Sequence, residues 1–471
     1  MPKLSPLPKL AQSPLSISLL ADNCTSMRQL VQVHAHMIVT GRISDNYAAS
    51  RLLSFAALHP AGDLLHAIAL FASTASPNSF MYNTLIRALA ASPTPSRALL
   101  LYPQMLLQGP PPGRHTFPFL LKAAANAADL PAARQIHAHA VLHGLDSDPY
   151  VANGLIRSYG ACGLLGDARQ MFDELPERNT ILFTTMVSGY SQNLCESEAV
   201  TLFGEMMTAG IQPCDAALAT VLSACARLGG LQLGMQIHEL IIQKGIAVGV
   251  ILGTALVDMY AKNGEISIAR KLFDEMHERN TATWNVMICG SAHYGHANYS
   301  LELFRRMEEV EIPPNDITFV GVLSACCHAG KVDFAREVFY SMESEYGIEP
   351  KVEHYGCMVN LLGRSGRLKE AEKLVKGMKH EVDVVILGAL LSSCRSHGDI
   401  KIAERVAQMI LRVDPSNHGV YVVLSNMYAE VGMWADVERL RMVMRHGGLK
   451  KISGWSFFDA NDSYTLVDRC V

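Results

Sequence analysis

One spacing organises this chain of 471 residues. Asn78, Asn179 and Asn280 stand 101 residues apart, and the similar segments ARQMFDELPERN and ARKLFDEMHERN end on the second and third of them. The segments ANGLIRSYGACG and GTALVDMYAKNG precede these at matching offsets. The period therefore belongs to whole segments. This indicates a repeat array with one continuous core, and not the several separate domains that the length alone would suggest.

The 101-residue period divides into units of 35, 35 and 31 residues, called here the lead, middle and short units, and the third triplet has nearly the same lengths, 35, 36 and 32. Three such triplets fill residues 79–383, and one middle-type and one short-type unit precede them in residues 11–78. The eleven units are 11–45, 46–78, 79–113, 114–148, 149–179, 180–214, 215–249, 250–280, 281–315, 316–351 and 352–383. We further predict a targeting leader in residues 1–10, an extension of two repeat-like helical pairs in 384–451, and a truncated tail in 452–471.

The apolar spacing within each unit is that of two helices. In unit 250–280, Leu256, Met259 and Tyr260 form one stripe, and a second stripe runs from Ala269 to Met276. Helices of about a dozen residues are marginal alone, so neighbouring units must bury each other's stripes. We predict an all-α fold, a right-handed superhelical solenoid of about eleven helix-turn-helix repeats plus a C-terminal helical extension.

Composition limits the classes of function. The formal net charge of −4 excludes a protein that holds nucleic acid by a strongly basic surface, so any RNA recognition must be local. No apolar stretch approaches the roughly 18 to 20 residues of a membrane helix. The 11 cysteines contain no C-x-x-C pair, suit a reducing compartment and are interpreted as small core residues. Residues 1–21 hold two lysines and no acid, which is typical of an organelle presequence or of an unstructured leader.

Two histidine pairs resemble metal ligands at first sight. His34 with His36 and His137 with His139 lie in QVHAH and QIHAH, 103 residues apart. Residues i and i+2 on a helix point to nearly opposite sides, and the recurrence marks a repeat consensus. We predict no metal site and no cofactor.

The tryptophans fall in two places. Trp284 occupies the aromatic position that Tyr82 and Phe183 fill in the other lead units, which favours core packing over base stacking. Trp434 and Trp455 lie in the extension and tail, where core packing and contact with a partner both remain open.

A column of small polar residues lies one turn inside the first helix of the units. It reads Asn83, Thr184 and Asn285 in the lead units, and Ser50, Asn153, Thr254 and Gly356 in the short units. Asn, Ser and Thr are indifferent helix formers, so helix propensity does not explain their recurrence. A row of short hydrogen-bonding groups can read the edges of splayed bases. The middle units carry Pro118, Ala219 and Val320 there, and we predict that they act mainly as spacers.

The last residue of each unit forms a second column. It reads Asn78, Asn179, Asn280, Asn315 and Asp383, with Gly113, Cys214 and Asp148 as departures. Asn or Asp immediately before a helix is a preferred N-cap. Capping and base reading are therefore both open for these positions.

The lead units YNTLIRAL…ALLLYPQM, TTMVSGYSQN…EAVTLFGEMMTAGIQP and WNVMICGSAHYG…SLELFRRMEEVEIPPN resemble pentatricopeptide repeats, and the triplet of lengths resembles the plant PLS subclass. Residues 384–451 are similar to the E extension that follows such arrays. The resemblance implies that the in-helix and unit-final residues act as a pair that selects one base, with RNA running 5′ to 3′ along the array.

On this resemblance, individual pairs imply individual bases. Ser50 with Asn78 and Thr254 with Asn280 would favour adenine; Asn153 with Asn179 and Asn285 with Asn315 would favour a pyrimidine. Thr184 with Cys214, Asn83 with Gly113 and Gly356 with Asp383 depart from the usual combinations, so no base is assigned to them.

The E extension in this subclass can be followed by a DYW domain that resembles zinc-dependent cytidine deaminases, whose chemistry needs H-x-E and C-x-x-C motifs. The sequence contains neither motif, so we predict no catalytic residue and no enzyme activity. The resemblance implies an organellar factor, with the mitochondrion favoured over the chloroplast, that binds single-stranded RNA without any membrane and recruits a deaminase in trans for C-to-U editing. Two alternatives remain: a factor for RNA stabilisation, splicing or translation, and a scaffold that binds proteins.

Overall fold

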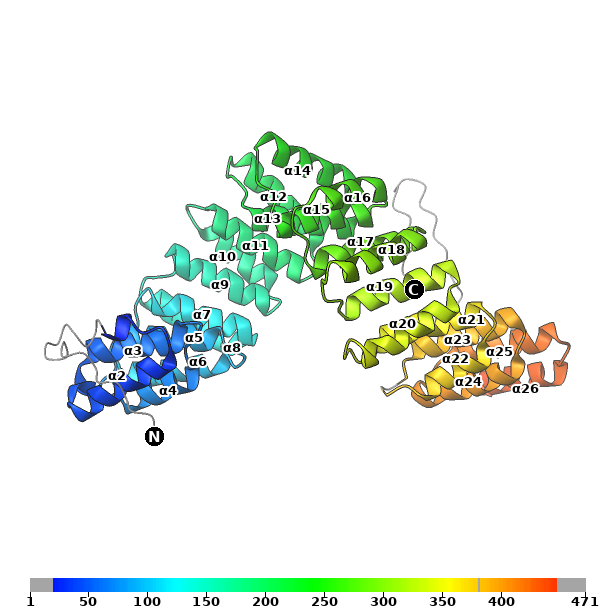
Figure 1. Cartoon of the computed structure of the whole chain (residues 1–471), viewed down its shortest axis with the longest axis horizontal. Coiled ribbons are helices and arrows are strands. Elements are labelled where there is room, and N and C mark those ends of the chain that lie inside the picture. Colours follow the sequence, from blue (N-terminus) through cyan, green and yellow to red (C-terminus); the bar gives the residue numbers. More distant parts are fainter. Residues whose placement is uncertain (1–19, 380–381, 447–471) are drawn as a thin grey trace. The chain divides into compact units, whose positions relative to one another are not determined.

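The structure is a computed structural model, and it describes residues 20–379 and 382–446. Within these ranges the regular structure is helical, and consecutive helices run antiparallel as pairs (Figure 1). The chain divides into two compact units at Asn263 and Gly264. Each compact unit is an all-α stack of helical pairs, as the sequence predicts.

The first helices of the pairs begin at the predicted start of a repeat or two residues after it, except α25 (His418–Glu430), which lies inside the extension, where the sequence predicts no start. They are α3 (Asn46–Leu58), α5 (Ser79–Ala90), α7 (Thr116–Ala127), α9 (Pro149–Ala161), α11 (Thr180–Gln192), α13 (Asp215–Leu228) and α15 (Val250–Lys262) in the first compact unit. In the second compact unit they are α17 (Thr281–His293), α19 (Asp316–Ala329), α21 (Val352–Arg364), α23 (Val384–His397) and α25 (His418–Glu430).

The second helices complete the pairs. They are α2 (Met27–Val39), α4 (Leu64–Ser73), α6 (Ser96–Gln108), α8 (Leu130–Leu142), α10 (Leu165–Glu174), α12 (Glu196–Thr208) and α14 (Leu231–Gln243) in the first compact unit. The second compact unit has α16 (Ile266–Glu275), α18 (Ala297–Glu309), α20 (Val332–Ser344), α22 (Leu368–Lys376), α24 (Ile400–Val413) and α26 (Trp434–His446). A short 3-10 helix, η1 (Arg42–Ser44), joins α2 to α3.

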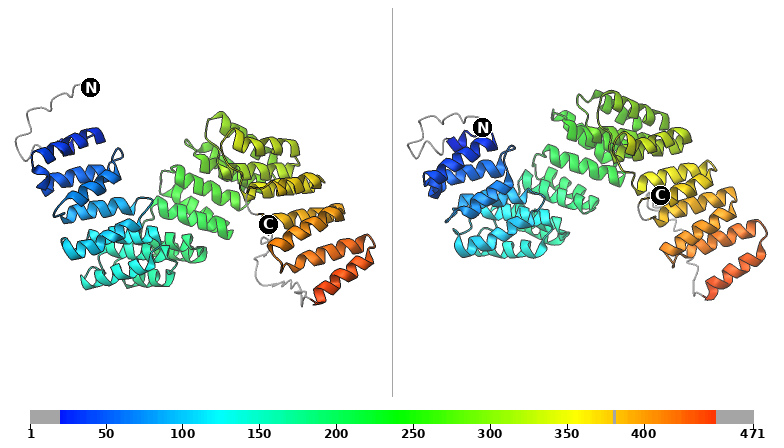
Figure 2. Two further views of the ribbon diagram at one scale, coloured as in Figure 1. Left: turned by 90° about the horizontal axis from the view of Figure 1, so that it is seen from below. Right: turned by 60° about the horizontal axis from the view of Figure 1, so that its bottom comes forward.

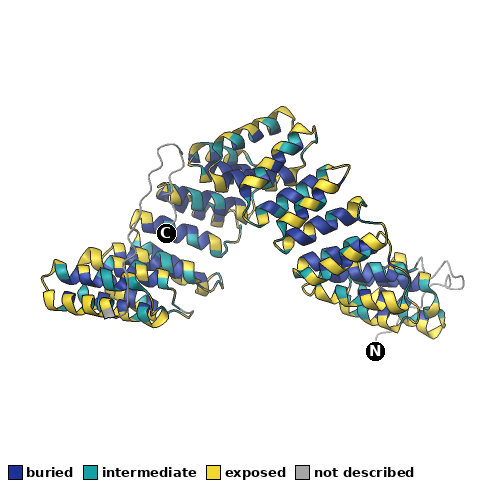
Figure 3. Cartoon of the chain, turned by 180° about the vertical axis from the view of Figure 1, so that it is seen from behind, coloured by how far each residue is buried: buried dark blue, intermediate teal, exposed yellow. Residues whose placement is uncertain are grey.

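Packing explains why short helices persist here. Within each compact unit, every first helix lies directly against the first helix of the next pair, and the second helices cover one side of this layer (Figure 2). Side chains such as Phe117, Phe172 and Phe319 are fully buried at these contacts. Buried residues face the neighbouring helices, whereas exposed residues follow the outer faces and the turns (Figure 3). Both apolar stripes predicted for unit 250–280 contain buried residues, which include Leu256 and Phe273.

The turn that ends the first helix of the middle units requires a left-handed backbone. Gly229 and Gly330 cap α13 and α19 with φ of 69° and 65°. Ala128 occupies the same column after α7 and adopts φ of 49°. Because a Cβ atom disfavours this conformation, this particular turn is strained in the first triplet and relaxed in the other two.

Candidate nucleic-acid interface

The unit-final column caps the helices that follow it. The side-chain oxygens of the five predicted residues each accept a backbone N–H two or three positions ahead, at 3.0 to 3.1 Å: Asn78, Asn179, Asn280, Asn315 and Asp383. The capping interpretation is thereby confirmed at all five positions. Capping engages the oxygen of each amide, so the four asparagines offer their NH₂ groups as donors, while Asp383 offers acceptors alone.

The hydroxyls of the in-helix column are oriented by their own helix. Ser50, Thr184 and Thr254 each donate to the carbonyl four residues earlier, with oxygen–oxygen distances of 2.5, 2.6 and 2.7 Å. This local bond supplies a structural role that sequence reasoning did not foresee. Because this bond uses the single hydroxyl proton, each hydroxyl oxygen can act toward other groups only as an acceptor.

The structure brings three of the predicted pairs into contact. Asn78 Nδ2 donates to Ser50 Oγ at 3.3 Å, and Thr184 Oγ1 lies 3.4 Å from Cys214 Sγ. Asn285 Nδ2 donates to Asn315 Oδ1 at 2.8 Å. The two columns therefore lie side by side, although each pair is 28 to 30 residues apart in sequence.

Comparison with known proteins identifies the repeats. Models of the PPR repeat match residues 150–180, 181–211, 254–281, 317–346 and 353–381, a PPR repeat family model matches 279–328, and the E motif matches 397–459. The pentatricopeptide repeat-containing protein At5g56310 of Arabidopsis thaliana is 37% identical over 93% of this chain and 89% of its own length. The chain belongs to the pentatricopeptide repeat (PPR) family. It is a PLS-type member with an E motif.

Further relatives agree. The mitochondrial PPR protein At1g77170 of Arabidopsis thaliana is 35% identical over 94% of this chain and 88% of its own length. Among solved structures, PPR10 in complex with an 18-nt psaJ RNA element matches with a TM-score of 0.67 at 19% identity. That match covers 93% of this chain and 64% of PPR10, and it shows the PPR fold.

Two asparagines of the in-helix column are held by threonines that sequence reasoning missed. Thr318 Oγ1 donates to Asn285 Oδ1 at 2.6 Å, and Thr185 Oγ1 donates to Asn153 Oδ1 at 2.7 Å. Asn285 is 5% exposed, and both ends of its amide are bonded to protein. The only sequence signal was a threonine three residues after the unit-final position, the N3 position of a capping box, as in Thr318.

Asn83 differs from the other asparagines of the column. Its Oδ1 is buried and has no hydrogen-bond partner in the part of the chain that the structure describes. The unit-final residue of this PPR unit is Gly113, where an added Cβ would meet no atom within 4 Å. No hydrogen bond from a described residue fixes the Asn83 amide oxygen, and because the terminal torsion is broad the oxygen can turn toward an incoming donor.

The last short unit, 352–383, has a glycine and hence no side chain in the in-helix column. Gly356 leaves its position in the column empty, with Ile386 Cγ1 3.9 Å from where a Cβ would lie. One turn further along, a pocket of about 560 Å³ is lined by polar residues of α21 and α23, which include Asn360, Arg364 and Ser392. The layer of first helices is therefore hollowed where the PPR array passes into the extension.

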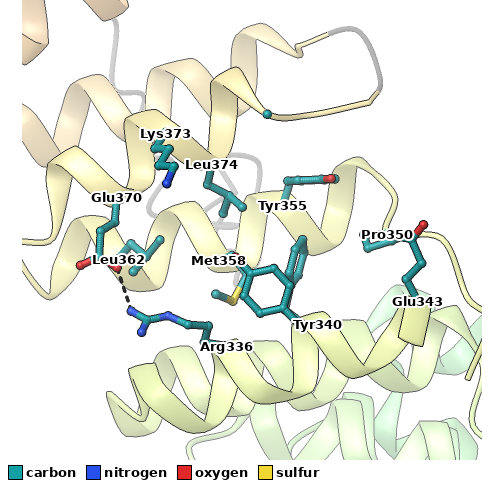
Figure 4. Close-up of a pocket in the computed structure, with 12 residues that line it drawn as sticks. Arg336, Tyr340, Glu343, Pro350, Tyr355, Met358, Leu362, Glu370, Lys373 and Leu374 are labelled. Atoms are coloured by element: carbon teal, nitrogen blue, oxygen red, sulfur yellow. Dashed lines mark hydrogen bonds and ion pairs between the residues drawn. The ribbon is translucent and has the colours of Figure 1, made fainter. Parts of the chain in front are cut away.

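A second pocket, of about 380 Å³, lies between α20, α21 and α22 (Figure 4). Tyr340, Tyr355 and Met358 form its apolar floor, and Arg336 Nη2 lies 2.7 Å from Glu370 Oε2 at its rim. None of the predicted base-reading residues lines it. This pocket is formed by the second helices α20 and α22 and the first helix α21, and neither of the two polar columns contributes to it.

One of the histidine pairs and two of the cysteines have structural roles. His137 Nδ1 lies 2.8 Å from the Tyr159 hydroxyl and His139 Nδ1 lies 2.7 Å from that of Tyr102, so the two rings point apart as predicted. Cys225 and Cys326 are buried core residues, and burial raises the pKa of their thiols to about 11 and about 12. The core interpretation is wrong for Cys214, which is exposed at the end of its unit.

The tryptophans divide as well. Trp284 is 3% exposed and packs edge-on against Phe273 with ring centroids 4.9 Å apart, so the prediction of core packing is confirmed. Trp434 is 66% exposed, beside the exposed side chains of Val431 and Met433. Core packing is thus excluded for Trp434, while Trp455 lies outside the described residues.

No helix in the described ranges is long and apolar enough to cross a membrane.

Proposed function

We propose that this PPR protein binds single-stranded RNA in an organelle and acts as a site-recognition factor for C-to-U editing, with the deaminase recruited in trans. The observation that carries the proposal is the pairing of the two polar columns. Helix capping and bonds to the helix backbone fix which donors and acceptors remain at Ser50 with Asn78. The likeness to PPR10, which was solved with an RNA element, supports the class of ligand.

The remaining groups suit different bases. At Ser50 with Asn78, one amide N–H and one hydroxyl lone pair remain beside each other. Adenine presents an amino donor next to a ring-nitrogen acceptor, which complements this pair. At Asn285 with Asn315, the Asn315 oxygen accepts from Thr318 and Asn285, so mainly amide donors remain. Donors suit the carbonyl oxygens of a pyrimidine.

The extension supports a protein partner. Val431, Met433 and Trp434 expose 54%, 41% and 66% of their surface at the junction of α25 and α26, inside the E motif. Exposed apolar groups that lie together mark interaction sites. Because the sequence contains neither H-x-E nor C-x-x-C, we assign the deamination step to the partner. Relatives named as chloroplastic, mitochondrial or both support an organellar location.

Selection from a library of short single-stranded RNAs tests base reading. Wild type should select adenine at the nucleotide that faces Ser50 and Asn78, and Ser50→Asn should shift this one position toward pyrimidines. Thr201→Asn is the matched control, because the Thr201 hydroxyl makes the same bond to the carbonyl four residues earlier but lies on the second helix α12. Unchanged preferences in Ser50→Asn, or none in wild type, would contradict the proposal.

Loss of the protein tests the role in editing. A knockout should abolish C-to-U conversion at one or a few organellar sites, and Trp434→Ala should abolish the same events while RNA binding persists. If editing is unaltered in the knockout, and instead one transcript is lost or is no longer spliced or translated, the editing role is wrong. The protein then acts in RNA stabilisation, splicing or translation.

A further inference from the structure

A third column lies one turn after the base-reading column and is basic in the first triplet. Arg87, Lys122 and Arg157 are spaced 35 residues apart, four residues after Asn83, Pro118 and Asn153. Each is the one Asp, Glu, Lys or Arg of its helix, in α5, α7 and α9. Three consecutive first helices therefore carry three positive charges and no negative charge.

The three helices are direct neighbours, which places the charges in a row. α7 packs against both α5 and α9. The Arg87 guanidinium reaches over α7 and lies 5.8 Å from the centre of the Phe119 ring. Packed helix axes are about 8 to 10 Å apart, so the charges repeat at roughly that interval.

These cations are available to a ligand. Arg87 and Arg157 are exposed and Lys122 is partly exposed. Within the described ranges none of the three forms an ion pair, whereas other basic residues such as Arg169, Arg336 and Arg405 do. In a chain of net charge −4, a regular row of unpaired cations needs a reason beyond solubility.

The same column is not basic elsewhere in the array. It reads Ser188, Ser223 and Asp258 in the second triplet and Cys289, Ser324 and Asn360 in the third. Asp258 is paired with Lys262 of its own helix at 3.0 Å. The positive row is therefore confined to units 79–179.

We propose that Arg87, Lys122 and Arg157 form a phosphate-binding stripe that holds the RNA backbone beside the base-reading column and concentrates the ionic part of RNA affinity in the first triplet. The inference rests on the proposed RNA binding. One cation per unit, at the spacing of the units, suits a polyanion that advances in step with the array. The stripe also gives the middle unit 114–148 a role: Pro118 cannot read a base, but Lys122 contacts the backbone.

The salt dependence of RNA affinity tests the stripe. Each phosphate contact with a single strand contributes about 0.7 to the slope of log affinity against log salt concentration, so Arg87→Gln, Lys122→Gln and Arg157→Gln together should lower that slope by about 2. Between 50 and 200 mM salt, wild type should then lose roughly 20-fold more affinity than the triple variant. Each single variant should lower the slope by about 0.7. Base preferences should not change.

A matched triple variant serves as the control. Arg97→Gln, Arg134→Gln and Lys244→Gln remove the same charge from exposed positions on or just after second helices of the same compact unit, and should leave the slope near the wild-type value. Circular dichroism should show native helix content in both triple variants, because all six side chains are at least partly exposed.

The outcomes separate this inference from the proposed function. If wild type binds RNA with base preferences but the stripe variant keeps the wild-type slope, the stripe is wrong and the proposed function stands. An equal drop of the slope in the control triple would also overturn the stripe, because it would show a general charge effect. If wild type binds no RNA, both proposals fail.

Discussion

Asn83 and Asn285 occupy the same column of two lead units, 202 residues apart, yet the structure treats them differently. Asn285 is 5% exposed and is bonded at both ends of its amide, whereas the amide oxygen of Asn83 is buried without a partner in the described residues. The same residue type in a repeat column therefore does not leave the same hydrogen-bonding atoms free. What it offers to RNA depends on the side chains that the next unit supplies.

The residue that ends each of the two lead units makes the difference: it is Gly113 in unit 79–113 and Asn315 in unit 281–315. Thr318 and Asn315 of the next unit boundary hold Asn285. Thr116 stands in the Thr318 column of the first triplet, but its hydroxyl accepts from the Gly113 amide, and Gly113 has no side chain to bond Asn83. Because Gly113 stands where unit 281–315 has Asn315, the hydrogen-bonded cluster seen around Asn285 does not form around Asn83.

The largest difference should follow from removing the threonine hydroxyls. Thr318→Val removes the hydrogen-bond partner of Asn285 Oδ1 and that of the Asn315 backbone N–H. The free energy of unfolding should fall by about 2 to 4 kcal/mol. Thr116→Val removes one bond from Gly113 and should cost about 1 kcal/mol. Thermal unfolding gives the size of the effect, and faster amide hydrogen exchange confined to α17 and α19 locates it for Thr318→Val. Equal costs for the two variants would break the comparison.

Replacement of the asparagines themselves should give a smaller contrast. Asn285→Leu removes the shortest acceptor of the Thr318 hydroxyl and one donor to Asn315 Oδ1, and should destabilise the protein by about 1 to 3 kcal/mol. Asn83→Leu removes a buried acceptor that has no partner among the described residues, so its cost should be below about 0.5 kcal/mol, or it should stabilise. Urea unfolding of both variants measures the contrast. A marked loss of stability in Asn83→Leu would show that its amide is held after all.

The smallest expected effect comes from rebuilding the missing pair. Gly113→Asn places an amide where an added Cβ meets no atom within 4 Å, at a residue whose φ is not left-handed. A new bond to Asn83 should stabilise the unit by about 0.5 to 1 kcal/mol. Gly113→Ala is the control, since it adds the Cβ without the amide. If the two variants have equal melting temperatures, the new asparagine has not bonded Asn83.

Much of the fold follows from the sequence alone. The 35, 35 and 31 spacing places the starts of the first helices from α3 to α23 to within two residues, and where the unit-final residue is Asn or Asp its role as an N-cap accounts for the start. The column positions of Ser50, Thr184 and Asn285 next to their unit-final partners also follow, because helical repeats of nearly constant length keep columns aligned.

The state of each side chain does not follow from the sequence. Whether Asn83 or Asn285 is free depends on atoms about 30 residues away and on distances of a few tenths of an ångström. The left-handed Ala128 breaks the glycine pattern of its column, and the exposure of Trp434 depends on which helices pack beside α26. Spacing and propensity carry no information on these contacts.

The central claim is that the in-helix column recognises bases through those donors and acceptors that are not already hydrogen-bonded within the protein. The most direct measurement is RNA selection with wild type and Asn83→Leu, with folding of the variant verified by its melting temperature. The account predicts that Asn83→Leu loses base preference at one nucleotide, that which faces unit 79–113, and about 1 to 3 kcal/mol of affinity. Unchanged affinity and unchanged preference at every position in a folded Asn83→Leu protein would contradict it.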